Sequence, residues 1–234
     1  MLDTKIGTQN EENRLFWLQK TLEKIPEGHR ILDAGAGEQQ FKRLCLHLEY
    51  VSQDFAKYDG SGDNKGLQVG KWNQENIDIV SDITSIPQPD SSFDAVLCTE
   101  VFEHIPEPLL ALKEFSRLLR PDGYLIITAP FCSLTHFSPY HYYSGFNRYF
   151  YETHLSQYGF EIIDLQANGN FFEYLAQELR RLPYIANTYS NDRMRKWENL
   201  ALKILLKALE RFYHQDKGSA NLLNFGFHVM AIKK

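Results

Sequence analysis

Two glycines and two carboxylates near the start of the chain have the types and spacing of a nucleotide-binding turn. The apolar pair Ile31-Leu32 runs into Asp33-Ala34-Gly35-Ala36-Gly37, and a second apolar segment ends at Asp54, about 20 residues further on. Glycine lets the backbone approach a ligand closely, and a carboxylate at the end of the next strand accepts hydrogen bonds from ribose hydroxyls. Strand, glycine turn and spaced acid together therefore predict a nucleotide half-site.

A second candidate region is the aromatic and histidine-rich segment 131–151. His136 and His141 could each take a proton from a hydroxyl group, and tyrosine rings suit a sugar or an aromatic ligand. The competing interpretation is that these rings form a small core of their own. His104, in the pair Glu103-His104, could also reach a substrate, although a histidine bonded to nearby backbone is the commoner case.

Composition limits what else the protein could be. The chain has 234 residues and a formal net charge of −5, which suits one α/β domain and argues against non-specific nucleic-acid binding. The spacing of Cys45, Cys98 and Cys132 fits neither a metal site nor a disulfide framework. No metal is expected. A polar N-terminus and the lack of long apolar runs predict a cytoplasmic protein without a membrane span.

The pattern of apolar residues predicts alternating strands and helices. Strands are expected at residues 30–34, 50–54, 78–80, 93–99, 124–129, 160–165 and 225–232. Helices are expected at 13–24, 38–48, 108–119, 152–158, 171–182 and 193–213, with a turn at 121–123. Nearly continuous apolar strands favour a parallel sheet covered on both faces. The glycine-rich segment 55–76 is predicted to be a long loop, either a partial lid over the site or a surface excursion.

Several motifs, in order, resemble those of class I S-adenosylmethionine-dependent methyltransferases that act on small molecules. They are Ile31–Glu38, Asp54, Ser81-Asp82-Ile83, Phe93–Ile105 and Arg120–Leu125. One departure is Gln39, which stands where this family often has a third glycine. The missing helical pattern after Asp54 is a second departure.

The resemblance implies a Rossmann-like, doubly wound α/β fold. Its sheet would be seven-stranded and mainly parallel, with an antiparallel last strand and a helical insertion before that strand. The expected parts of this single domain are an N-terminal helix in 1–27, a cofactor-binding core in 28–166, a helical cap in 167–221 and the final strand in 222–234.

The resemblance also implies S-adenosyl-L-methionine as cofactor and a set of residues that touch it. These residues are Asp33, Ala34, Gly35, Gly37, Asp54, Phe55, Asp82, Ile83, Thr99 and Glu100. The four acids have plainer alternatives: Asp33 as a helix N-cap, Asp54 as a turn acid at the strand end, Asp82 as a turn acid before Thr84, and Glu100 as a cap of the following turn.

The expected reaction is methyl transfer to a small-molecule acceptor, with an oxygen of a sugar-like or small organic molecule as first choice. A nicotinamide-dependent oxidoreductase and a non-catalytic S-adenosylmethionine-binding protein are the alternatives. Residues 193–213 carry an apolar stripe that includes Trp197, Leu200, Ile204, Leu205 and Phe212. This stripe favours packing on the domain or on a second copy in a homodimer over contact with an anionic membrane surface.

Overall fold

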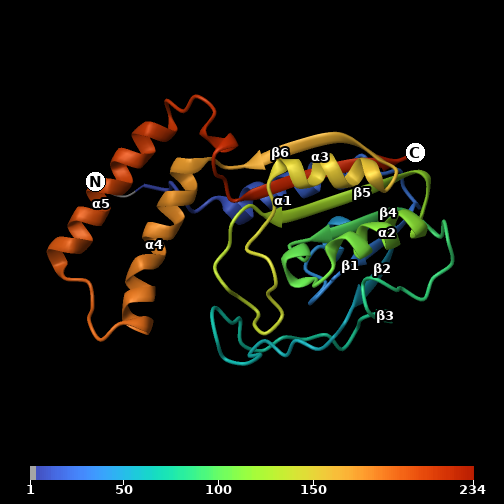
Figure 1. Ribbon diagram of the computed structural model, residues 1–234, viewed down its shortest axis with the longest axis horizontal. Helices are drawn as coiled ribbons and strands as arrows, with labels where there is room; N and C mark the ends of the chain where they lie inside the picture. The colour runs from blue at the N-terminus through green and yellow to red at the C-terminus, as the bar shows by residue number, and fades with distance from the viewer. Residues whose placement is uncertain (1–3) are drawn as a thin grey trace. The chain divides into compact units, whose positions relative to one another are not determined.

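The computed structural model describes residues 4–234, which form two compact units. One unit comprises the chain up to Leu15 together with Ala167–Phe225, and the other comprises Phe16–Gln166 and Gly226–Lys234. Figure 1 shows the order of the elements along the chain. The larger unit contains both candidate regions found in the sequence.

A seven-stranded sheet organises the larger unit. Its strands are β1 (Arg30–Ala34), β2 (Glu49–Asp54), β3 (Ile79–Val80), β4 (Phe93–Thr99), β5 (Leu119–Pro130), β6 (Phe160–Asn168) and β7 (Gly226–Lys233). Across the sheet they lie in the order β3-β2-β1-β4-β5-β7-β6. The pairs β1·β2, β1·β4, β2·β3 and β4·β5 are parallel, and β7 is antiparallel to β5. The predicted fold class is therefore confirmed, including the antiparallel last strand.

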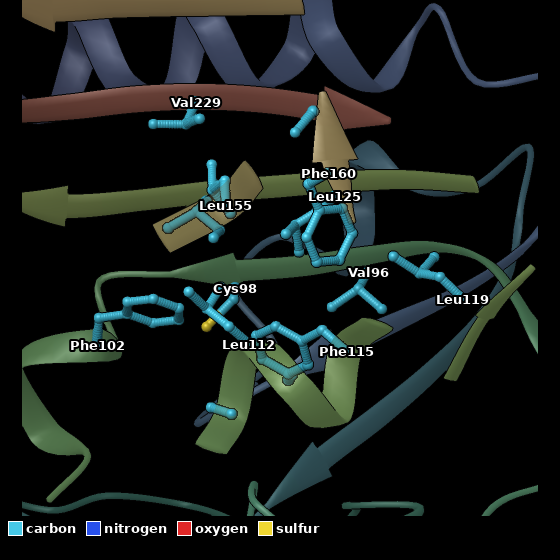
Figure 2. Close-up of a cluster of buried hydrophobic side chains, with 14 of the residues drawn as sticks. Val96, Cys98, Phe102, Leu112, Phe115, Leu119, Leu125, Leu155, Phe160 and Val229 are labelled. Atoms are coloured by element: carbon cyan, nitrogen blue, oxygen red, sulfur yellow. The ribbon is translucent and has the colours of Figure 1, made fainter. Parts of the chain in front are cut away.

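The helix α2 (Pro108–Leu118) shows how the apolar pattern builds the core. Pro108 begins the helix, and Ala111, Leu112, Phe115 and Leu118 are buried at the spacing of one helix face. Figure 2 shows Leu112 and Phe115 beside Val96 and Cys98 of β4. Burying one such large side chain contributes about 1.5–3 kcal/mol to folding. This packing fixes β4, whose carboxyl end belongs to the candidate site.

Two further helices belong wholly or partly to this unit. The helix α1 (Asn10–Leu22) buries Trp17, Leu18, Thr21 and Leu22. The helix α3 (Arg148–Gln157) starts earlier than predicted because the Asn147 side chain accepts hydrogen bonds from the first turn, from the backbone N–H of Tyr149 and Phe150. It ends before Gly159, whose φ of +81° only glycine adopts readily.

The helix predicted over 38–48 is wrong. The segment between β1 and β2 consists of turns and one short 3-10 helix, η1 (Lys42–Leu44). Gln39 adopts a left-handed φ of +57°, which an α-helix cannot contain. Phe41 and Cys45 are both buried, four positions apart. Their spacing resembles that of one helix face, although the segment that contains them is not an α-helix.

The expected turn at 121–123 is instead part of β5. Phe93 of β4 pairs with Leu119 and Ala95 pairs with Tyr124, so a bulge accommodates the additional residues of β5. Asp122 lies in this bulge with a left-handed φ of +63°. The turn-forming residues are therefore present, but they bend one strand and do not separate two elements.

The smaller unit is mainly helical. It contains α4 (Phe171–Tyr189), α5 (Lys196–Tyr213) and the 3-10 helix η3 (Ser219–Asn221). Its small core gathers Ile6, Ala176, Leu206 and Leu209. Leu209 of the predicted α5 stripe is buried, whereas Trp197, Leu200, Ile204, Leu205 and Phe212 are exposed in the single chain, so their packing on a second copy stays a prediction. None of the helices in residues 4–234 is long and apolar enough to span a bilayer.

Candidate functional site

The turn after β1 lies against the end of β2. The backbone N–H groups of Gly35 and Ala36 both donate to the carbonyl oxygen of Gln53, each over 2.9 Å. Gly35 has a φ of +79°, and a Cβ atom there would lie 2.6 Å from both methyl groups of Val101. Glycine is therefore required at Gly35 for its backbone angle and for its close approach to the chain after β4.

Asp54 connects directly to the same turn. Its Oδ2 accepts a hydrogen bond of 2.9 Å from the backbone N–H of Gly37, and its Oδ1 accepts one of 2.8 Å from Ala56 N–H. The Asp54 residue is only 6% exposed. The glycine turn and the strand-end acid, paired from the sequence, are thus adjacent in space, and the backbone fixes the orientation of the carboxylate.

Side chains of the 55–76 loop contact both Asp54 and the glycine turn. The Nε2 atom of Gln74 donates to Oδ1 of Asp54 over 2.9 Å. The ring of Trp72 lies at Gly37, since a Cβ atom on that glycine would be 2.7 Å from Cζ2 of Trp72. The loop contains no α-helix, as predicted. Its contacts with the turn and with Asp54 favour the lid interpretation over a surface excursion.

Asp33 is held by β2 and not by the turn it precedes. Tyr50 donates its hydroxyl proton to Oδ2 of Asp33 over 2.5 Å, and Asp33 is 1% exposed. Burial raises the pKa of Asp33 to about 7, the Tyr50 hydrogen bond opposes that rise, and the charge of Asp54 adds to it. The helix N-cap alternative is wrong, because no α-helix follows β1.

Asp82 and Ile83 follow β3 beside the end of β2. The backbone N–H of Ser81 donates to the carbonyl oxygen of Asp54 over 3.1 Å, so this turn adjoins the acid. Oδ1 of Asp82 accepts hydrogen bonds from the backbone and hydroxyl of Thr84, which lower the Asp82 pKa. Asp82 is exposed and Ile83 is half-buried. The turn described by the plainer alternative is present, and it leaves Asp82 at the surface.

Thr99 and Glu100 occupy the carboxyl end of β4. Thr99 is buried, and Glu100 has a left-handed φ of +53°, which is costly for a residue with a side chain. Oε1 of Glu100 accepts a hydrogen bond of 2.8 Å from the hydroxyl of Thr128 on β5. Glu100 therefore connects β4 to the neighbouring strand. A strained backbone held in this way is a common feature of functional sites.

The remaining two predicted cofactor residues differ in exposure. Ala34 is fully buried among the apolar core residues, whereas Phe55 is half-buried. Phe55, directly after Asp54, places its ring edge-on to Tyr140, with 4.9 Å between the ring centres. This contact joins the end of β2 to the loop that follows β5.

The two predicted catalytic histidines lie together, and a third joins them. Ring centres are 4.8 Å apart for His136 and His141, and 4.6 Å apart for His104 and His136. His104 ends the 3-10 helix η2 (Phe102–His104) after β4. Nε2 of His141 lies 3.2 Å from the hydroxyl of Ser133. Burial, together with His136, lowers the pKa of His141.

Backbone carbonyl groups set the tautomers of two of these rings. Nδ1 of His104 lies 2.5 Å from the carbonyl oxygen of Tyr140, and Nδ1 of His136 lies 2.9 Å from that of Leu134. A carbonyl oxygen can only accept, so each Nδ1 carries the proton. Burial lowers the pKa of His104 to about 3, with His136 contributing. His104 is therefore a neutral imidazole whose Nε2 bears a lone pair.

Glu103 completes this cluster and was not assigned a role from the sequence. Its Oε1 lies 3.8 Å from Nε2 of His104 and 3.8 Å from Nε2 of His136, and the residue is 1% exposed. The backbone hydrogen bond of His104 agrees with expectation. The approach of His136 to Glu103 could not be read from the sequence, because a folded loop brings these residues together.

A family model described as a methyltransferase domain matches residues 11–209 of the chain. The chain belongs to this methyltransferase family. Its cofactor is S-adenosylmethionine, as the resemblance implied, and the nicotinamide alternative has no support.

Two curated relatives illustrate the similarity. The demethylmenaquinone methyltransferase of Renibacterium salmoninarum is 30% identical over 81% of this chain and 76% of its own length. The ubiquinone biosynthesis O-methyltransferase of Leptothrix cholodnii is 27% identical over 49% of each protein. The chain thus spans about half the length of the second relative.

Solved structures share the fold of this methyltransferase. A S-adenosylmethionine-dependent methyltransferase from Archaeoglobus fulgidus aligns with a TM-score of 0.56, 16% identity and 94% coverage of both chains. The cyclase SpnF aligns with a TM-score of 0.55 and 20% identity over 94% of this chain and 80% of its own. One fold can serve different reactions, so the acceptor chemistry has to be argued from the site.

Proposed function

We propose that this methyltransferase transfers the methyl group of S-adenosylmethionine to an oxygen atom of a small organic acceptor that carries a hydroxyl group. The observation that carries the cofactor half of this proposal is the 2.9 Å hydrogen bond from Gly37 N–H to Asp54. It places a backbone turn and a carboxylate side by side at the carboxyl ends of β1 and β2, where ligands bind in open α/β sheets.

The proposed cofactor contacts follow the strand ends. Asp54 would accept from the ribose hydroxyls, Asp82 from the adenine amino group with Ile83 and Phe55 beside the ring, and the backbone from Asp33 to Gly37 would face the ribose and the tail. Thr99 and Glu100 would line the methionine part. When bound, the cofactor supplies a methyl group on a positively charged sulfur. Gln74 must leave Oδ1 of Asp54 if a ribose hydroxyl is to take its place.

The acceptor would lie beside the histidines that follow β5. His141 suits the role of proton acceptor, because Ser133 orients its ring and its lowered pKa keeps it neutral near pH 7. Nε2 of His136 is directed toward Glu103, so His136 would position the acceptor. The names of the two curated relatives support a quinone-type acceptor, and the second name also supports oxygen as the methylated atom. A sugar-like hydroxyl remains the alternative within the same class.

The experiment measures cofactor binding and methyl transfer separately. Calorimetry with S-adenosylhomocysteine should give a Kd at least about 100-fold weaker for Asp54→Ala than for the wild type, because a charged hydrogen-bond acceptor is lost from each ribose contact. Asp54→Asn keeps an acceptor for the turn without the charge and should bind with intermediate affinity. Wild-type affinity in Asp54→Ala would contradict the ribose assignment.

A matched control and an acceptor panel complete the test. Glu75→Ala removes an exposed carboxylate from the same loop and should bind S-adenosylhomocysteine like the wild type. Labelled methyl donor, offered with hydroxylated quinones, phenols, sugars and amines, should label a hydroxylated compound. Labelling of amines alone would contradict the oxygen assignment. Cofactor binding without labelling of any compound would favour the non-catalytic alternative.

The partners and location expected from the sequence remain predictions. The exposed apolar residues of α5 are the surface on which a homodimer contact or a contact with an anionic membrane would form. Analytical ultracentrifugation with and without phosphatidylglycerol vesicles distinguishes these cases, since a homodimer forms without lipid. The cytoplasmic location is a further prediction, tested by fractionating the source cells.

A further inference from the structure

Glu103, His104 and His136 present three metal-ligating atoms to one another within 4.8 Å. We propose that these residues bind one divalent transition-metal ion of the Zn²⁺ type. The sequence predicted no metal site, because its ligand residues show no recognisable spacing. The ligands come from the segment after β4 and from the loop after β5, and the fold alone brings them together.

The outer hydrogen bonds of the cluster are those that a metal site needs. A histidine that binds a metal usually donates its other ring N–H to a backbone carbonyl or a carboxylate, which fixes the tautomer and the ring plane. His104 and His136 both show this arrangement, with Tyr140 and Leu134 providing the carbonyl oxygens. In both rings Nε2 is then the nitrogen on the side where Glu103 lies.

The separations between the ligand atoms fit a cation at their centre. Each Nε2 is 3.8 Å from Oε1 of Glu103, which is too long for a hydrogen bond. Two ligands of a tetrahedral Zn²⁺ ion, each about 2.0–2.1 Å from the metal, are about 3.3 Å apart. Small rotations of the three side chains would close that difference. Within residues 4–234, no hydrogen bond is made to the buried Nε2 of His104.

The ligand atoms determine which cation fits. Two imidazole nitrogens and one carboxylate oxygen suit Zn²⁺, Fe²⁺, Co²⁺ or Ni²⁺, whereas Mg²⁺ prefers oxygen ligands and retains its water. Three protein ligands leave at least one position for a further group. His141 lies beside the two histidine ligands, since its ring centre is 4.8 Å from that of His136 and 5.8 Å from that of His104.

The cluster is connected to the proposed cofactor turn by packed rings. His104 stacks on Phe137 at 5.1 Å, Phe137 contacts Trp72 at 5.4 Å, and Trp72 lies at Gly37. An ion here would therefore lie on the acceptor side of the cofactor. If the proposed function holds, its open position would bind the acceptor oxygen, whereas metal binding itself does not depend on that function.

The test uses the full chain after chelator treatment and measures metal binding by calorimetry and elemental analysis. The wild type should bind one Zn²⁺ per chain, and Co²⁺ in its place should give visible absorption bands of nitrogen and oxygen coordination. Mg²⁺ should bind at least about 100-fold more weakly. His136→Ala, a change in a partly exposed loop, should weaken Zn²⁺ binding at least about 100-fold, and Glu103→Gln should do the same.

Control variants separate this site from other metal-binding groups. His154→Ala removes a half-buried imidazole from α3, and Cys132→Ser removes the exposed thiol; both should bind Zn²⁺ like the wild type. If Glu103→Gln does not fold, His136→Ala decides the result. Unchanged Zn²⁺ affinity in His136→Ala, equal affinity for Mg²⁺, or no binding by the folded wild type would each overturn the proposal.

The two proposals can fail separately. S-adenosylhomocysteine binding is measured on the chelator-treated protein, where it depends on Asp54 and not on the histidines. Cofactor binding without Zn²⁺ binding would leave the proposed function standing and remove the metal site. Zn²⁺ binding without cofactor binding would leave the metal site standing and contradict the proposed function.

Discussion

The glycine turn after β1 and the histidine cluster after β5 lie at the same edge of the sheet but are held in different ways. Backbone N–H groups of the turn donate hydrogen bonds to Gln53 and Asp54, and both of these partners belong to the neighbouring strand β2. The cluster depends on loops: Tyr140 and Leu134 orient the rings of His104 and His136.

This difference separates the turn, which we propose binds the cofactor common to the family, from the loops, which we propose bind the acceptor. A turn held by neighbouring strands is defined by a short stretch of sequence and is shared by a whole family of cofactor-binding proteins. A cluster assembled from loops can change without disturbing the sheet, which agrees with our proposal that the acceptor is chosen there. Three groups of variants and one crystal structure test this distinction.

The largest effect is expected from Gly35→Ala, because this change alters the glycine turn after β1 itself. Alanine would be strained at a φ of +79°, and its Cβ would lie 2.6 Å from the Val101 methyl groups. These two costs together should destabilise the fold by about 2–5 kcal/mol. Chemical unfolding gives the loss of stability, and calorimetry should detect loss of S-adenosylhomocysteine binding.

Gly28→Ala is the matched control for Gly35→Ala. Gly28 has a φ of +77°, and a Cβ there would meet nothing within 4 Å, so this variant shares the backbone strain without the clash. It should lose only about 1–2 kcal/mol and keep cofactor affinity. Val101→Ala should partly restore Gly35→Ala. Equal losses in the two glycine variants would contradict the claimed close approach of the turn to Val101.

A smaller effect, on the order of 2 kcal/mol, is expected from Asp33→Asn and should depend on pH. The raised pKa of about 7 means that folded Asp33 keeps its proton when the unfolded carboxyl, at 3.8, has lost it. This contribution to stability is complete below pH 3.8 and is lost as the pH rises through about 7. Urea unfolding from pH 4 to 8 should therefore show Asp33→Asn gaining stability relative to the wild type.

Tyr50→Phe sharpens the same measurement. The Tyr50 hydroxyl opposes the rise in the Asp33 pKa, so its removal should move the loss of stability to higher pH. If the stability difference between Asp33→Asn and the wild type is the same at pH 4 and pH 8, Asp33 does not titrate in this range. The account of its burial would then be wrong.

The smallest effect is expected from Gln74→Ala, which tests the contact between the 55–76 loop and the end of β2. Gln74 donates to Oδ1 of Asp54, the atom proposed to accept from a ribose hydroxyl. Removing this competitor should strengthen S-adenosylhomocysteine binding about two- to tenfold, the range expected for one hydrogen bond of about 0.5–1.5 kcal/mol. Calorimetry measures the change.

Asn76→Ala removes an amide two positions from Gln74, on an exposed residue, and should leave the affinity unchanged. If Gln74→Ala bound S-adenosylhomocysteine more weakly than the wild type, Gln74 would be a contributor to the cofactor site. The competition between its side chain and the ribose would then be refuted.

Sequence patterns predicted the glycine turn and the strands that hold it well, for a physical reason. The apolar strands of a buried parallel sheet are recognisable, and the residues at their carboxyl ends must meet at one edge. The pairing of Asp54 with the glycine turn follows from this rule alone. The prediction failed at 38–48, where Phe41 and Cys45 are buried at helical spacing but Gln39 adopts a left-handed conformation.

The histidine cluster could not be predicted, since no periodic sequence pattern describes the loops that form it. The backbone of Leu67 bonds to Thr135 and Phe137, which joins two loops far apart in the sequence. Only this folded arrangement brings His136 to Glu103. For α5, the apolar stripe was recognised, but amphipathicity alone does not show which side of a helix finds a partner.

The most direct test of the account is a crystal structure of the protein with S-adenosylhomocysteine. The account predicts the ribose hydroxyls within hydrogen-bonding distance of Asp54, the Gln74 side chain displaced from Oδ1, and the sulfur directed toward His141. A ligand bound elsewhere, with Gln74 still bonded to Asp54, would contradict it.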